Sequence, residues 1–181
     1  MNAESGAPRL FHVSDQPDIT LFEPRPSPST NPTAPEQPVV WAIAGRLLHN
    51  YLLPRNCPRV TFYALPDSDP DDVARLMGQT AARYVVAVES GWLTTIRSAI
   101  LYLYEFPGEG FRELDSGAGY FVRETAVVPL SVRRVDDLLG ELATRDVELR
   151  VTPSLWPLRD AVLASSLQFS VIRMRNARPR R

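Results

Sequence analysis

Cysteine and histidine are scarce in this chain, which limits the chemistry it can carry. Its 181 residues include one cysteine, Cys57, and two histidines, His12 and His49. A single thiol excludes a disulfide bond within the chain. Structural zinc sites are built from four ligands, mostly cysteine and histidine, so this supply also argues against such a site. We therefore predict no metal centre.

Long hydrophobic runs and an excess of charge are absent as well. No apolar stretch approaches the roughly 20 residues that a membrane-spanning helix needs, and residues 1–6 lack the basic and apolar regions of a signal peptide. The formal net charge is −1, so no overall electrostatic force draws the chain to nucleic acid or to membranes. These absences predict a cytoplasmic protein without a membrane partner, for which nucleic acid is not an expected ligand.

What the chain does have is the composition of an ordinary globular protein. Hydrophobic residues make up 44% and charged residues 23% of its 181 residues, enough to build a core. We predict a disordered leader over residues 1–7, a single domain over 8–176 and a basic tail over 177–181. The domain is expected to be α+β, with mostly antiparallel twisted sheets flanked by a few helices.

Alternating, β-rich segments predict short strands whose short connections favour antiparallel pairing. The expected strands are residues 9–14, 38–43, 60–64, 84–89, 100–106, 111–114, 119–123, 125–129 and 147–151. The expected helices are residues 44–53, 69–77, 91–98, 136–144 and 156–174. The second of these helices has a capping residue, Asp69, followed by proline at its first position.

A proline-rich segment separates the first two expected strands. Residues 24–38 contain six prolines, and each removes a backbone donor and fixes φ, so regular structure is not expected there. The segment can be a surface linker. It can also border a ligand, because long loops inside a domain often do so.

The first expected strand carries two polar residues on one face. His12 and Ser14 are two positions apart, and strand side chains alternate between faces. An imidazole and a hydroxyl in that arrangement can hydrogen-bond the groups of a sugar, but the imidazole can equally be satisfied by neighbouring backbone. Trp41 and Tyr51 offer rings that either stack on a base or fill the core.

These segments resemble motifs of the ADP-ribosyltransferase fold, in particular of the small rifamycin-modifying enzymes in its His-Tyr-Glu branch. Leu10–Ser14 is similar to the first motif, Val40–Ile43 to the second, and the segment around Glu124 to the third. Three positions depart from the family pattern. Val13 stands where the family has glycine, and Trp41 stands where it has tyrosine. Glu124 lies in an expected turn and lacks the Glu/Gln-x-Glu spacing of the protein-modifying members.

The resemblance implies an NAD-binding, ADP-ribosyltransferase-like protein of unknown acceptor substrate. It assigns catalysis to His12 and Glu124, and contacts with NAD to His12, Ser14, Trp41 and Tyr51. Over its full length the chain also resembles a small uncharacterised bacterial protein family.

Arginines recur in two short stretches. Arg55 and Arg59 directly follow Pro54 and Pro58 in one short stretch, while Arg173 and Arg175 are among five arginines in the last nine residues. Rigidly held guanidinium groups can bind the phosphate of a nucleotide or another anion. The first stretch can also be a tight turn with exposed arginines, and the second a solvated terminus.

Two other functions therefore stay open beside the transferase. One is a non-catalytic module that binds a phosphate-bearing or other anionic ligand through these four arginines. The other is a structural or partner-binding protein with no small-molecule site. Cys57 is interpreted as a buried, unreactive thiol rather than a nucleophile, because no acidic helper lies near it in the sequence.

Overall fold

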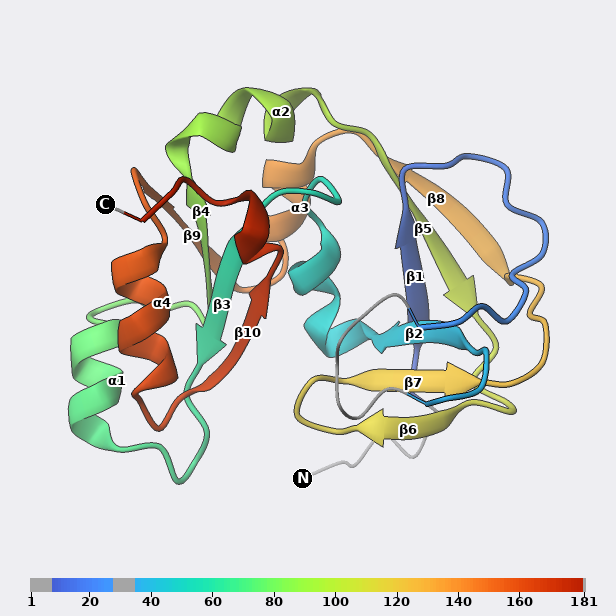
Figure 1. The fold of residues 1–181 in the computed structure, drawn as a ribbon, viewed down its shortest axis with the longest axis horizontal. Coiled ribbons are helices and arrows are strands. Elements are labelled where there is room, and N and C mark those ends of the chain that lie inside the picture. The colour runs from blue at the N-terminus through green and yellow to red at the C-terminus, as the bar shows by residue number, and fades with distance from the viewer. Residues whose placement is uncertain (1–7, 28–34, 181) are drawn as a thin grey trace. The chain divides into compact units, whose positions relative to one another are not determined.

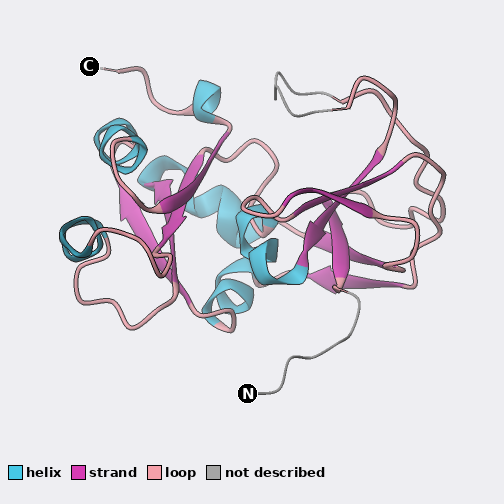
Figure 2. Ribbon diagram, turned by 90° about the horizontal axis from the view of Figure 1, so that it is seen from below, coloured by secondary structure: helices cyan, strands magenta, loops and turns pink. Residues whose placement is uncertain are grey.

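The computed structural model describes residues 8–27 and 35–180, so the predicted leader lies outside the described residues. Helices and sheets are both present and nearly all strand pairs are antiparallel, which confirms the α+β class (Figures 1 and 2).

The chain forms two compact units, and each is assembled from two separate stretches of sequence. Unit 1 comprises Met1–Leu48 and Leu101–Val135, and unit 2 comprises His49–Ile100 and Asp136–Arg181. The single domain expected over residues 8–176 stays a prediction.

Unit 1 is built on a six-stranded antiparallel sheet with the strand order β6-β7-β2-β1-β5-β8 (Figure 1). Its strands are β1 (Leu10–Ser14), β2 (Val40–Ala44), β5 (Leu101–Phe106), β6 (Arg112–Asp115), β7 (Tyr120–Arg123) and β8 (Ser131–Val135). A 3-10 helix, η1 (Gly45–Tyr51), follows β2 directly.

One apolar cluster of unit 1 lies on one face of this sheet. Leu10, Tyr104 and Phe106 are buried there together with Phe22, which lies in the loop after β1. Phe22 and Val127 exchange two backbone hydrogen bonds of 2.9 Å, and the Phe22 ring centroid lies 5.1 Å from that of Tyr104 and 4.8 Å from that of Phe106. The loop after β1 therefore covers the cluster.

The end of the proline-rich segment is anchored in the same unit. Arg25 and Val39 exchange backbone hydrogen bonds of 3.1 and 3.0 Å, which joins the two sides of the segment where it meets β2. Residues 28–34 fall outside the described range, so its interpretation as a linker or as a ligand-bordering loop stays a prediction.

Unit 2 contains a four-stranded sheet with the order β10-β3-β4-β9, in which only β4 and β9 are parallel. The strands are β3 (Arg59–Tyr63), β4 (Tyr84–Glu89), β9 (Val147–Thr152) and β10 (Gln168–Ile172). The helices are α1 (Pro70–Leu76), η2 (Ser90–Trp92), α2 (Leu93–Ser98), α3 (Leu138–Ala143), α4 (Trp156–Leu163) and η3 (Met174–Asn176).

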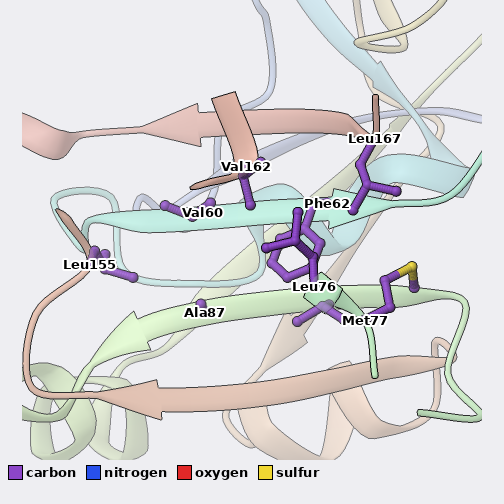
Figure 3. Close-up of a cluster of buried hydrophobic side chains, with 9 residues drawn as sticks. Val60, Phe62, Leu76, Met77, Ala87, Leu155, Val162 and Leu167 are labelled. Carbon is purple, nitrogen blue, oxygen red and sulfur yellow. The ribbon is translucent and has the colours of Figure 1, made fainter. Parts of the chain in front are cut away.

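Helices α1 and α4 cover one face of this sheet and close an apolar cluster beneath them. Figure 3 shows Phe62 among side chains from both helices and both central strands. The β4 strand is buried at all six positions, as expected for a continuous apolar run in the middle of a sheet. Asp69 caps α1 as predicted, its carboxylate accepting a 2.8 Å hydrogen bond from the Asp71 N–H.

The long helix expected over residues 156–174 is wrong. The helix α4 ends at Leu163, and β10 follows at Gln168. The Asp72 carboxylate accepts hydrogen bonds of 2.8 and 2.9 Å from the N–H and hydroxyl of Ser166, which fixes the turn between them. The alternation of β10 pairs with β3 instead of continuing the helix.

Two further predictions need correction near these sheets. Residues 125–129 do not form a strand: only Val127 makes an isolated bridge, and the strand β8 begins at Ser131. The helix expected over residues 44–53 is the shorter 3-10 helix η1. Pro129 supplies no backbone donor, which is consistent with pairing that begins only beyond it.

Candidate functional site

His12 in unit 1 is packed among apolar side chains. Its Nδ1 lies 3.1 Å from the main-chain oxygen of Trp41, and its ring centroid lies 4.9 Å from that of Phe22. The residue is half-buried on the same sheet face as Leu10, which belongs to the core cluster. This geometry fits a histidine satisfied by its own protein.

The indole of Trp41 lies on the opposite face of that sheet. Phe11 pairs with Ile43, and directly paired residues project to the same face. Trp41 therefore shares the face of Phe11, not that of His12. Its ring packs edge-on against Tyr120, with 5.7 Å between centroids. The register thus separates the two rings that the resemblance placed around NAD.

The other two expected residues of unit 1 are both near the surface. The Ser14 hydroxyl accepts a 3.0 Å hydrogen bond from the Gln16 N–H, which closes a local turn. Glu124 is exposed in the bend that follows β7. Catalysis by His12 and Glu124, and contacts of these residues with NAD, stay predictions.

Arg59 in unit 2 is buried and braces the loop that precedes it. Its Nε donates to the Asn50 oxygen at 2.9 Å, and its Nη1 donates to the oxygens of Cys57 at 2.9 Å and Pro54 at 3.4 Å. Its guanidinium carbon lies 5.8 Å from the ring centroid of Tyr51. Arg59 thereby holds the turn that carries Arg55 at the surface.

The pairing of β3 with β10 brings the two arginine stretches together. Ile172 pairs with Arg59, so the chain after Ile172 runs alongside the loop before Arg59. The Asn176 side-chain amide donates a 2.7 Å hydrogen bond to the Asn56 oxygen, which fixes that arrangement.

Arg173 stands at the centre of the resulting cluster. Partial burial lowers the pKa of its guanidinium, and the positive charges of Arg175 and Arg55 lower that pKa further, while Tyr51 acts in the opposite direction. In the part of the chain that the structure describes, none of the three guanidinium groups forms an ion pair. We call these three residues the arginine cluster.

Many other arginines of the chain are neutralised by carboxylates. Ion pairs join Arg9 to Glu105, Arg75 to Asp72, Arg145 to Glu141, Arg150 to Glu148, and both Arg159 and Arg180 to Asp160. One signal in the sequence could have drawn attention to these groups: all 20 basic residues are arginine and none is lysine. Arginine is the side chain that binds carboxylate and phosphate in a bidentate manner.

Cys57 lies in the same loop but points inward. It is fully buried, its thiol donates a 3.6 Å hydrogen bond to the Pro58 oxygen, and burial raises its pKa to about 12. Such a thiol stays protonated at neutral pH, which supports the predicted unreactive role.

Over the described residues, no group of three or more histidine, cysteine or acidic side chains is placed to hold a metal ion. Within the same residues, no helix has the length and apolar character to cross a membrane. The cytoplasmic location stays a prediction.

No curated protein and no solved structure matches the chain significantly, so nothing supports the expected relationship to ADP-ribosyltransferases. One family model does match, and it spans residues 11–177 with the description "Family of unknown function". This confirms the resemblance to an uncharacterised family, and the chain belongs to the family of unknown function DUF6886.

Proposed function

We propose that unit 2 binds a phosphate-bearing anion through the arginine cluster. The observation that carries this proposal is the convergence of Arg55, Arg173 and Arg175 without an ion-pair partner among the described residues, close enough to lower the pKa of Arg173. Crowded positive charges repel one another, and an anion between them converts that repulsion into attraction.

Phosphate suits this arrangement better than a single carboxylate does. Each guanidinium group offers several N–H donors in a planar fork, and a phosphate has enough oxygens to accept from more than one fork at once. Tyr51 borders the cluster, as its effect on the pKa of Arg173 indicates. An aromatic side chain at that place favours a ligand with a sugar or base attached to its phosphate.

The proposal is a binding function and requires no catalytic group. NAD would be one ligand of the right chemistry, because its pyrophosphate carries two adjacent charges. Transfer of ADP-ribose would in addition require His12 and Glu124 of unit 1, and no observation favours that step over binding alone.

The test is calorimetric titration with inorganic pyrophosphate, ADP and NAD at low ionic strength. Hydrogen bonds to charged groups contribute about 1.5–3 kcal/mol each, so replacing all three arginines by glutamine should weaken pyrophosphate binding at least about 100-fold. The matched control is Arg97→Gln, which removes an exposed arginine of α2 in the same unit and should leave the affinity unchanged.

Two results would overturn the proposal. The first is a wild-type protein that binds none of the three ligands. The second is a triple variant that binds pyrophosphate as well as the wild type does. Tighter binding of ADP than of pyrophosphate would identify a nucleotide as the ligand class.

A further inference from the structure

The last residues of the chain form a strap that is fastened to unit 2 by a buried carboxylate. We define the strap as residues 173–180. Glu89, at the end of β4, is only 2% exposed. One of its oxygens accepts a 3.1 Å hydrogen bond from the Leu155 N–H at the start of α4, and the other accepts a 3.0 Å hydrogen bond from the Arg178 N–H of the strap.

Both of these N–H donors stabilise the buried side chain of Glu89. A buried carboxyl group without hydrogen-bond partners is strongly unfavourable, so each of the two N–H groups stabilises Glu89. Glu89 holds the strap through the main chain of Arg178, and the guanidinium group of Arg178 takes no part in this hydrogen bond.

Three more contacts fasten the strap to α4. The Trp156 indole N–H donates a 2.6 Å hydrogen bond to the Arg178 oxygen. The Arg180 guanidinium carbon lies 4.9 Å from the Trp156 ring centroid, and its Nη2 forms an ion pair with Asp160. The main chain of Arg178 is thus gripped on both its donor and its acceptor side.

At its other end, the strap carries Arg173 and Arg175 of the arginine cluster. Arg173 adopts a left-handed backbone conformation with φ 58° and ψ 29°. This conformation is unfavourable for a non-glycine residue, so it persists only where the surroundings impose it. Docking of the strap also has to overcome the repulsion between the positive charges of Arg173 and Arg55.

We propose that Glu89 is a positioning residue for the anion site, acting through the strap. It clamps Arg178 and thereby keeps Arg173 and Arg175 beside Arg55. Anion binding and strap docking are then coupled, since the anion removes the repulsion that opposes docking. This inference rests on the proposed function of the arginine cluster, and thermodynamic reciprocity requires each event to favour the other.

The first experiment is a double-mutant cycle on pyrophosphate affinity. Glu89→Gln keeps the size of the side chain and one acceptor for Leu155, but its amide N–H₂ cannot accept from the Arg178 N–H. We expect Glu89→Gln to lose about as much affinity as a variant with Arg173→Gln and Arg175→Gln. The combination of all three changes should lose little more affinity, because Glu89→Gln alone already releases Arg173 and Arg175 from the site.

General destabilisation would not produce that result. If Glu89→Gln acted only by destabilising the protein, it would lower the affinity of the arginine variant and of the wild type by the same factor, and the two losses would add. Additive losses in the cycle would therefore overturn the inference.

The second experiment uses a pair of variants at one position, which avoids changing a buried residue. Arg178→Pro and Arg178→Ala both remove the guanidinium group, but only proline also removes the N–H that Glu89 accepts. Position 178 precedes Pro179, where extended backbone compatible with proline is already favoured. We expect Arg178→Pro to weaken pyrophosphate binding about 10-fold or more and Arg178→Ala to weaken it much less.

Limited trypsin digestion reports strap docking without any ligand. Cleavage after Arg175 should be faster in Glu89→Gln and Arg178→Pro than in the wild type and Arg178→Ala, and pyrophosphate should protect the wild type. If the wild type does not bind pyrophosphate, the proposed function and this coupling both fail. If it binds and the four proteins share one affinity and one cleavage rate, only the inference fails.

Discussion

In unit 1, the imidazole of His12 contacts the Trp41 main chain and the Phe22 ring, so its interactions are made within the protein itself. In unit 2, the guanidinium groups of Arg55, Arg173 and Arg175 crowd together and no ion pair among the described residues neutralises them. The difference teaches that a polar side chain points to a ligand when its charge or its hydrogen-bonding groups are not satisfied within the protein. Its residue type alone is weaker evidence.

The largest expected effect concerns Cys57, which lies two residues after Arg55 but is buried within the protein. Burial raises its pKa from 9.0 to about 12, so at pH 8 the folded protein should react with iodoacetamide at least about a thousandfold more slowly than the denatured protein does. Mass spectrometry of timed samples measures the two rates.

Fast labelling of the folded protein would show that Cys57 is exposed and would remove the contrast within this loop.

The same shift in the pKa of Cys57 has a second consequence. Because the folded state holds the thiol proton more tightly, this group's contribution to stability is present below pH 9.0 and is lost as the pH rises towards 12. A Cys57→Ala variant should lack that part of the alkaline loss.

The next effect tests whether His12 is structural. His12→Ala removes a ring packed on Phe22 and should lower the free energy of unfolding by about 1–3 kcal/mol, as measured by urea denaturation. Its affinity for pyrophosphate should equal that of the wild type. His12→Gln keeps a hydrogen-bond donor and should lose less stability. A stable His12→Ala variant with weakened ligand binding would reverse the comparison between the units.

A smaller effect is expected from one residue of the arginine cluster. Arg173→Gln relieves the repulsion with Arg175 and Arg55, so the free energy of unfolding should stay constant or rise by up to about 0.5 kcal/mol. The same change should weaken pyrophosphate binding about tenfold, since one charged donor is lost. Thermal melts and calorimetry measure the two quantities. A strongly destabilised variant would mean that Arg173 has a structural partner.

The smallest effect concerns a charge in unit 2 that is paired. Hydrogen bonds from the Ser166 N–H, the Arg75 guanidinium and the Ser166 hydroxyl lower the pKa of the Asp72 carboxyl. A lowered pKa means that the contribution is present above the usual aspartate range and is lost as the pH falls through the folded-state value. The urea midpoints of the wild type and Asp72→Asn should therefore differ at pH 7 and converge in acid. A constant difference would assign the effect to shape rather than charge.

The local elements of the fold could largely be predicted from the sequence. The strand Tyr84–Glu89 has the predicted bounds, because a continuous run of apolar residues admits few alternatives. The cap at Asp69 was likewise readable from its own side chain and the proline after it. The end of α4 could not be predicted from the local sequence, because it depends on a hydrogen bond between Ser166 and Asp72, which is distant in the sequence.

The candidate site could be predicted only in part, for the same reason. Alternation places His12 and Ser14 on one face of a strand, but the pairing with β2 decides that Trp41 faces the other way. The two arginine stretches were visible, and their proximity follows from the pairing of Ile172 with Arg59. Strand register is set by the whole sheet, and a single segment does not contain it.

The division of each unit into two stretches of sequence has a consequence for synthesis. Strands β1 and β2 leave the ribosome long before β5 to β8, and β3 and β4 long before β9 and β10. Neither sheet can be completed from the first half of the chain, and such distant pairings form slowly. The nascent chain therefore exposes unpaired strand edges until translation is nearly finished, so a chaperone that shields them should raise the yield of folded protein.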